Sequence, residues 1–145
     1  MIVADKRDYV RGYKKHYSAY KSLVENGIAE KSRKLLLAYC VECGLKSLLL
    51  DKWNENSPKD ILENKEDRRN AIIKSHNLEM ILKELNQQGV FHFPRIRTVH
   101  KDMVSTEEFH QMCRYGIEVE SREKEKEEVY EKELQKVAEW IGEEV

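Results

Sequence analysis

Proline and glycine are scarce in this sequence. Only two prolines and six glycines occur among its 145 residues. Both residue types interrupt regular structure, so their scarcity argues against a fold built from many tight turns. The alternation of apolar and polar residues that marks a half-buried strand is nowhere sustained. We therefore expect an all-α protein, with helices joined by a few loops, forming one domain over residues 1–145.

A long apolar run is also missing. The N-terminus has no apolar stretch of signal-peptide length, and Glu42 and Lys46 interrupt the most apolar segment, Leu35 to Leu50. Such a segment neither directs secretion nor spans a membrane. Three cysteines cannot all pair with one another, and they do not resemble a secreted disulfide framework. The sequence predicts a reducing, cytoplasmic location and no membrane partner.

Net charge is almost absent. The chain has 26 basic and 27 acidic side chains, a formal net charge of −1 at pH 7, so no overall field draws it to nucleic acid. The charges are nevertheless segregated, because the first 46 residues are rich in Lys and Arg whereas residues 118–145 are mostly acidic. We expect a basic face opposite an acidic one, and RNA binding would require a local patch.

Five segments have helical character. Apolar residues recur in them at helical spacing, and Gly27 and Gly89 supply stop signals. They are Asp5–Glu25, Ala29–Trp53, Asn77–Gln87, a helix that begins at Ser105, and Ser121–Ile141. The second segment is apolar on nearly all sides, so it is predicted to be the central helix. The last has a narrow apolar stripe and is predicted to cover the core.

The remaining segments are predicted to be less regular. Ser57-Pro58 fits the start of a short helical turn. The charged residues 63–70 are expected to be exposed. Residues 90–103 lack a helical period, which indicates a loop that packs Phe91 and Phe93 onto the core.

Two features near the C-terminus concern helix boundaries. The sequence Ser105-Thr106-Glu107-Glu108 fits a capping box, in which Ser105 accepts from the amide of Glu108 and the Glu108 side chain reaches back. Gly116 is expected to bend or end the helix that follows. Residues 118–128 are polar enough to form a frayed or solvent-bridging segment.

Three short motifs follow one another along the chain. They are AYCVECGLKSLL at residues 38–49, SHNLEMIL at 75–82 and CRYG at 113–116. This set resembles HEPN domains, in which a helix reading roughly A-x-x-x-E-x-x-L-K-A-L-L precedes an H-D-L-type helix start and an R-Y-P-like step. Asn77 stands here in place of the usual acidic residue, and Gly116 in place of the proline. The resemblance extends over about residues 29–141.

The resemblance implies a fold and a biological setting. HEPN domains are up-and-down bundles of four or five helices and are often dimeric. They occur in bacterial and archaeal toxin–antitoxin, defence and nucleotidyltransferase-linked proteins. The resemblance therefore implies a single HEPN-like domain, a homodimer, and a nucleotidyltransferase-type or antitoxin partner.

The resemblance also defines a test for catalysis. Some members are metal-independent ribonucleases that carry an Arg followed, after four to six residues, by a His, and others are non-catalytic. Three pairs here have that spacing: Arg11 with His16, Arg69 with His76, and Arg95 with His100. We favour Arg69 and His76 as the catalytic pair, because a polar residue follows the arginine and His76 opens a helix. The alternative is that His76 caps its own helix while Arg69 lies in solvent.

The chemistry of such a pair needs no metal and no cofactor. Histidine can remove a proton from an RNA 2′-hydroxyl near neutral pH, and arginine can stabilise the charge that develops on phosphorus. A second group of residues would bind the ligand or its phosphate: Glu42, Lys46, Arg114 and Tyr115. Glu42 and Lys46 are spaced i, i+4 in an apolar helix, so the alternative for them is a partly exposed ion pair.

Two further patterns have a functional and a structural interpretation. Cys40-x-x-Cys43 has metal-like spacing, but on an apolar helix with only Cys113 besides, it favours buried packing. The first helix carries cations interleaved with tyrosines, which could contact an RNA backbone and stack bases. A solvated basic face over a tyrosine-packed core is favoured instead.

Two hypotheses remain for function. The first is a non-catalytic HEPN-like module that acts with a partner in a toxin–antitoxin or defence-type system. The second is a metal-independent endoribonuclease that uses Arg69 and His76, with Arg114 or Lys46 assisting phosphate binding.

Overall fold

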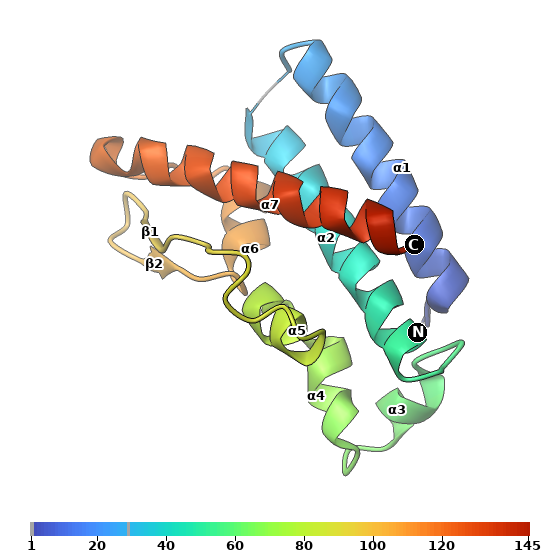
Figure 1. Cartoon of the computed structure of the whole chain (residues 1–145). Helices are drawn as coiled ribbons and strands as arrows, with labels where there is room; N and C mark the ends of the chain where they lie inside the picture. Colours follow the sequence, from blue (N-terminus) through green and yellow to red (C-terminus); the bar gives the residue numbers. More distant parts are fainter. Residues whose placement is uncertain (1, 29) are drawn as a thin grey trace.

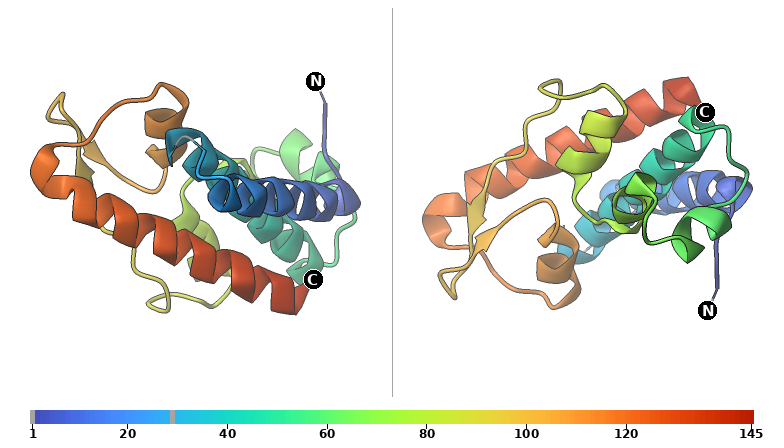
Figure 2. Two further views of the ribbon diagram at one scale, coloured as in Figure 1. Left: turned by 90° about the horizontal axis from the view of Figure 1, so that it is seen from above. Right: turned by 90° about the horizontal axis from the view of Figure 1, so that it is seen from below.

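Three long helices dominate the structure, which is a computed structural model that describes residues 2–28 and 30–145 (Figure 1). They are α1 (Lys6–Glu25), α2 (Glu30–Lys52) and α7 (Lys124–Glu144). Helices α1 and α2 lie side by side, and α7 crosses α2 (Figures 1 and 2). The protein is an all-α helical bundle, as predicted. The described residues form seven α-helices, which are these three and four short ones, where the sequence predicted four to five.

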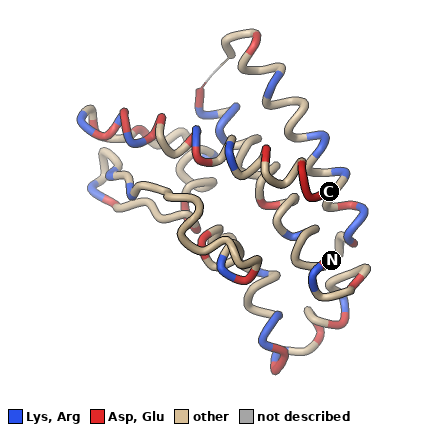
Figure 3. Tube along the Cα trace, viewed as in Figure 1, with Lys and Arg blue, Asp and Glu red and all other residues tan. Residues whose placement is uncertain are grey.

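Helix α1 begins and ends as its sequence predicts. Asp5 and Asp8 form a capping box, since the Asp8 amide donates to Asp5 at 2.8 Å and the Asp5 amide donates to Asp8 at 3.0 Å. The helix ends at Glu25, and Gly27 follows with a φ of +62°, which favours glycine. The tyrosine stripe packs inward as expected: Tyr13 and Tyr20 are buried. Lys and Arg recur along α1 (Figure 3), and most of these side chains are exposed.

Helix α2 is the centre of the fold, as predicted. It packs against α1, α5, α6 and α7, and its apolar side chains from Leu37 to Leu50 are nearly all buried. Gly44 allows both long neighbours to approach closely. A Cβ at this position would lie 2.7 Å from the side chain of Ile141 on α7 and 2.9 Å from that of Tyr13 on α1.

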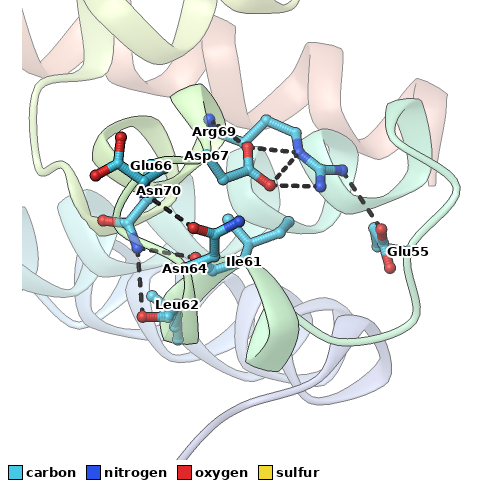
Figure 4. Close-up of polar contacts among 8 residues, drawn as sticks. All are labelled: Glu55, Ile61, Leu62, Asn64, Glu66, Asp67, Arg69 and Asn70. Carbon is cyan, nitrogen blue, oxygen red and sulfur yellow. Dashed lines mark hydrogen bonds and ion pairs between the residues drawn. The ribbon is translucent and has the colours of Figure 1, made fainter.

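Three short helices follow α2: α3 (Lys59–Glu63), α4 (Arg68–Lys74) and α5 (Leu78–Glu84). The prediction that residues 63–70 are exposed is wrong at Asn70, which is buried in α4. Its amide donates to the carbonyls of Ile61 at 2.8 Å and Leu62 at 3.3 Å, which ties α4 to α3 (Figure 4).

The segment between α5 and α6 packs its aromatic side chains inward, as predicted. Phe91 lies against Trp140 with ring centroids 6.1 Å apart, and Phe93 lies against Tyr130 at 5.0 Å. The segment also contains a small antiparallel sheet that the sequence did not reveal. Its strands are β1 (Ile96–Arg97) and β2 (Met103–Val104).

The capping box predicted at Ser105 is wrong. The N-cap of helix α6 (Phe109–Arg114) is Glu108, three residues after the expected N-cap Ser105. The Ser105 hydroxyl donates to the Glu108 carboxylate at 2.9 Å, and a turn joins the two residues. The helix ends before Gly116, whose φ is +63°.

Buried ion pairs dock the first half of α7 onto α2. Lys34 is fully buried and lies 3.3 Å from Glu127, which also pairs with Lys31. Arg33 donates two hydrogen bonds of 2.9 Å to Glu131, which accepts a third from Tyr20 at 2.8 Å. The prediction of a frayed segment over residues 118–128 is therefore wrong, because a 3₁₀ turn (Ser121–Glu123) and α7 order it.

The apolar stripe of α7 is buried as predicted. Tyr130, Leu134, Val137 and Ile141 are completely shielded from solvent. Charges of both signs recur along α7 (Figure 3), with Glu more frequent than Lys, as the mostly acidic sequence of residues 118–145 predicts. Within the described ranges, no helix combines the length and the apolarity that crossing a membrane requires.

Candidate functional site

Glu42 and His76 meet at the surface of the bundle. Glu42 lies on α2, and His76 lies in the link between α4 and α5. The Nδ1 of His76 is hydrogen-bonded to the Glu42 carboxylate. The His76 side chain is half exposed, whereas that of Glu42 is mostly covered. Glu42 therefore holds one nitrogen of the ring, and the ring remains accessible.

Two helix caps hold His76 in place. The Ser75 hydroxyl accepts from the Asn77 amide at 2.8 Å. Asn77 is the N-cap of α5, because its side chain accepts from the Met80 amide at 3.2 Å, and it also accepts from the Thr106 hydroxyl at 3.0 Å. The alternative that His76 caps its own helix is therefore wrong.

A second histidine lies beside the first. His110 on α6 has its ring centroid 4.8 Å from that of His76, with the two planes at 47°. Burial lowers the pKa of His110, the neighbouring His76 lowers it further, and the Glu42 carboxylate opposes the shift. His110 is thus favoured in its neutral form. Sequence reasoning missed this residue, although it stands one helical turn before Arg114 on the same helix.

Arg114 and Tyr115 are at the outer edge of this group. Arg114 donates a hydrogen bond of 3.0 Å to the Tyr39 hydroxyl, which links α6 to α2. Tyr39 also lies 6.1 Å from His16 on α1, measured between ring centroids. Tyr115 is 69% exposed, which is unusual for a large aromatic side chain. These residues extend the polar surface from the two histidines towards α1.

Lys46 lies one turn from Glu42 on α2 but does not pair with it. Among the described residues, the ion pair of Glu42 is with His76, and no ion pair of Lys46 is present. Lys46 is 7% exposed. The alternative of a surface ion pair between Glu42 and Lys46 is therefore wrong, and Glu42 is directed towards the histidines instead.

Arg69 has a different environment from His76. Its guanidinium donates to Asp67 at 2.7 and 3.0 Å and lies 3.4 Å from Glu55, as Figure 4 shows. It also lies over the ring of Trp53, at 5.6 Å from its centroid. None of these partners contacts His76 in the described chain. The structure therefore does not bring the predicted pair together, and two carboxylates already neutralise Arg69.

A narrow crevice runs inward from the two histidines. Ala38, Leu78 and Phe109 form its apolar wall, and Thr106 and Tyr130 also line it. Tyr130 is completely buried, so it lies at the inner end. The crevice has room for about one water molecule. A bulky ligand would therefore contact the histidines from outside.

The cysteines are part of the core. Burial raises the pKa of the Cys40 thiol to about 12 and that of Cys43 to about 11, so both stay protonated near neutral pH. The thiols of all three cysteines are free. Over residues 2–28 and 30–145, no group of three or more His, Cys, Asp or Glu side chains is arranged to hold a metal ion.

The group of Glu42, His76, His110 and Arg114 can act on a phosphate ester. Two histidines can accept and donate protons near neutral pH, and a guanidinium can stabilise an anionic oxygen.

No family model, curated protein or solved structure matches this chain.

Proposed function

We propose that the protein is a HEPN-like helical module that acts with a partner in a prokaryotic toxin–antitoxin or defence-type system. One observation supports this assignment above the others. The three motif segments, which lie between Ala38 and Gly116 in the sequence, contact one another on one surface. Glu42 of the first contacts His76 of the second, and Arg114 of the third contacts Tyr39 of the first.

The exposed part of this surface suggests a binding role. Tyr and Arg are the residue types most enriched at the centres of protein interfaces, and Arg114 and Tyr115 are both exposed here. The partner is a second copy of the chain or an antitoxin or nucleotidyltransferase-type protein.

Sedimentation of the purified protein, alone and with a candidate partner protein, tests this role. We expect a homodimer or a mixed complex that the double substitution Arg114→Ala/Tyr115→Ala weakens by about a thousandfold, because interface anchors of this type contribute about 2 kcal/mol each and every 1.4 kcal/mol is a factor of ten. Lys132→Ala on the outer side of α7 is the matched control and should leave assembly unchanged. A protein that stays monomeric under all conditions would contradict the proposal.

A second candidate function is metal-independent cleavage of RNA, and the histidine pair is the observation that favours it. His110, neutral because its pKa is lowered, would take the proton of the 2′-hydroxyl as this oxygen attacks phosphorus. His76 would return a proton to the 5′-oxygen as the P–O5′ bond breaks, which leaves a 2′,3′-cyclic phosphate and a 5′-hydroxyl. Arg114 would stabilise the anionic phosphorane.

This candidate differs from the Arg69–His76 hypothesis in one measurable way. Labelled total RNA and tRNA are incubated in EDTA with wild type and with single alanine variants. We expect His76→Ala and His110→Ala to lose cleavage by at least a hundredfold, a typical contribution of acid–base catalysis, while Arg69→Ala retains it. His92→Ala, at an exposed histidine elsewhere, is the control. If neither wild type nor any variant cleaves RNA, the ribonuclease candidate is rejected and the binding module remains the proposed function.

A further inference from the structure

Two side chains of the central helix α2 contact the groups that would act on a phosphate ester. Glu42 is hydrogen-bonded to Nδ1 of His76, and the Tyr39 hydroxyl accepts a hydrogen bond of 3.0 Å from Arg114. Tyr39 and Glu42 are three residues apart, so they are neighbours on one face of α2. One turn of a single helix therefore contacts both His76, in the link between α4 and α5, and Arg114, at the end of α6.

Helix α2 is a firm base for these two contacts. It packs against α1, α5, α6 and α7, and its apolar side chains are nearly all buried. The Tyr39 ring also lies beside that of His16 on α1, with centroids 6.1 Å apart. The two groups that α2 contacts are less enclosed, because the His76 ring is half exposed and Arg114 is a long, exposed side chain. A fixed orientation of either group therefore depends on a contact with the packed helix.

The Glu42 contact determines which nitrogen of His76 can serve a substrate. An ionised carboxylate has no proton to donate, so Nδ1 carries the proton of this hydrogen bond. A carboxylate at Nδ1 holds an imidazole in one tautomer and one orientation, with Nε2 on the other side of the ring. When His76 gives the proton on Nε2 to the leaving 5′-oxygen, the ring keeps the proton on Nδ1, where Glu42 already holds it. The transfer therefore needs no rotation of the ring.

The Tyr39 contact orients Arg114 without neutralising it. A guanidinium has five N–H donors in a fixed plane, and the Tyr39 hydroxyl accepts from one nitrogen, Nη2. The phenol hydroxyl is uncharged, so the positive charge of Arg114 stays available for an anionic oxygen. Arg69 is different, because it pairs with two carboxylates.

We propose that Tyr39 and Glu42 are positioning residues, which fix the orientations of Arg114 and His76 for phosphoryl transfer. They act through these two groups and do not touch the substrate. One turn of α2 sets the separation of the two contact points, so the acid and the cation keep a constant relation to each other. The catalytic role rests on the proposed cleavage of RNA, whereas the two orientations can be measured without a substrate.

NMR of the full chain measures the two orientations separately. Imidazole ¹⁵N chemical shifts of neutral His76 should report the Nδ1–H tautomer in wild type and a mixture in Glu42→Gln, because a carboxamide can donate as well as accept. The Nε–H group of Arg114 should be ordered in wild type and gain fast motion in Tyr39→Phe. Each substitution should leave the orientation of the other group unchanged, which a general loosening of the fold would not do.

Tyr17→Phe and Glu128→Gln are the matched controls. They make the same chemical changes on α1 and at an exposed position of α7, and they should alter neither orientation. An unchanged tautomer in Glu42→Gln would overturn the role of Glu42, and unchanged arginine mobility in Tyr39→Phe would overturn that of Tyr39.

Cleavage kinetics in EDTA test the catalytic consequence. Glu42→Gln should lower kcat by about a hundredfold and leave KM unchanged, because a misoriented acid loses its contribution only in the transition state. Tyr39→Phe should lower kcat/KM by about tenfold, which corresponds to one hydrogen bond to a charged group. Wild-type rates in both variants would refute the positioning role. If wild type itself cleaves no RNA, the ribonuclease proposal fails, and the NMR results still decide whether α2 orients the two side chains.

Discussion

Replacing Gly44 by alanine should destabilise the protein, although alanine is the better helix former. An added Cβ would lie 2.7 Å from Cγ2 and 2.8 Å from Cδ1 of Ile141, and 2.9 Å from Cδ1 of Tyr13. Carbon atoms pack at about 3.5–4.0 Å, so both neighbours must move. Neither is free to do so, because Ile141 is fully buried and the Tyr13 hydroxyl donates to the carbonyl of Ala138 at 2.6 Å.

The magnitude follows from two opposing effects. Alanine in place of glycine inside a helix stabilises it by about 1 kcal/mol. Inserting an extra carbon into a packed core costs about 1–3 kcal/mol, and contact with side chains on two helices places Gly44 near the upper end. The net loss in the free energy of unfolding should be about 2 kcal/mol. For a chain of this length, the melting temperature should fall by about 4–8 °C.

Urea denaturation of five proteins tests this reasoning: wild type, Gly44→Ala, Gly12→Ala, Ile141→Ala and the double variant Gly44→Ala/Ile141→Ala. Gly12→Ala is the control, because its Cβ would lie 3.2 Å from one sulfur atom, that of Cys43, and it should stay within about 1 kcal/mol of wild type. The double variant Gly44→Ala/Ile141→Ala removes two of the three clashing atoms. It should lose about 1 kcal/mol less than the sum of the single variants. A Gly44→Ala protein more stable than wild type, with additive effects in the double variant, would refute the proposed packing.

Three other perturbations have expected outcomes. Glu127→Gln removes one of the two carboxylates that pair with the buried ammonium of Lys34, while Glu30 remains, and should cost about 1–3 kcal/mol in urea denaturation, whereas Lys34→Met should cost less. His110 should titrate by NMR below its ordinary pKa, and the lowering should be larger in Glu42→Gln. Between this lowered pKa and the unfolded value near about 6.5, the folded state binds fewer protons than the unfolded state. The folded state therefore loses stability as the pH falls through this range. Asn70→Ala should cost about 1–3 kcal/mol and loosen α3 first in hydrogen exchange, because two carbonyls of α3 lose their donor.

The long helices could be predicted because their signals are long. The tyrosines of α1 recur over about three turns, and the apolar residues of α2 surround the helix over about four. Helix α4 has only seven residues, and its polar start at Arg68 reads as exposed. Its burial depends on Asn70 reaching carbonyls of α3, which local pattern does not reveal.

The candidate site could be predicted only in part. The motifs indicated Glu42 and His76 separately, but their contact joins residues 34 positions apart. The Arg69–His76 spacing suggested proximity, yet Arg69 stands at the start of α4 and His76 just past its end. The two side chains have different partners instead, because Arg69 pairs with Asp67 and Glu55 and His76 pairs with Glu42. His110 was missed because its importance arises only from the His76 ring that packs beside it.

The buried ion pairs between α2 and α7 also bear on how the protein is made. Lys34 is synthesised early, but its buried counterion Glu127 follows 93 residues later, and Glu131 follows Arg33 by 98. Before that stretch is made, Lys34 has only its helix neighbour Glu30 as a carboxylate partner, and Arg33 lacks Glu131. Docking of the first half of α7 onto α2 therefore requires nearly the whole polypeptide, because the carboxylates that bury these cations lie near its end.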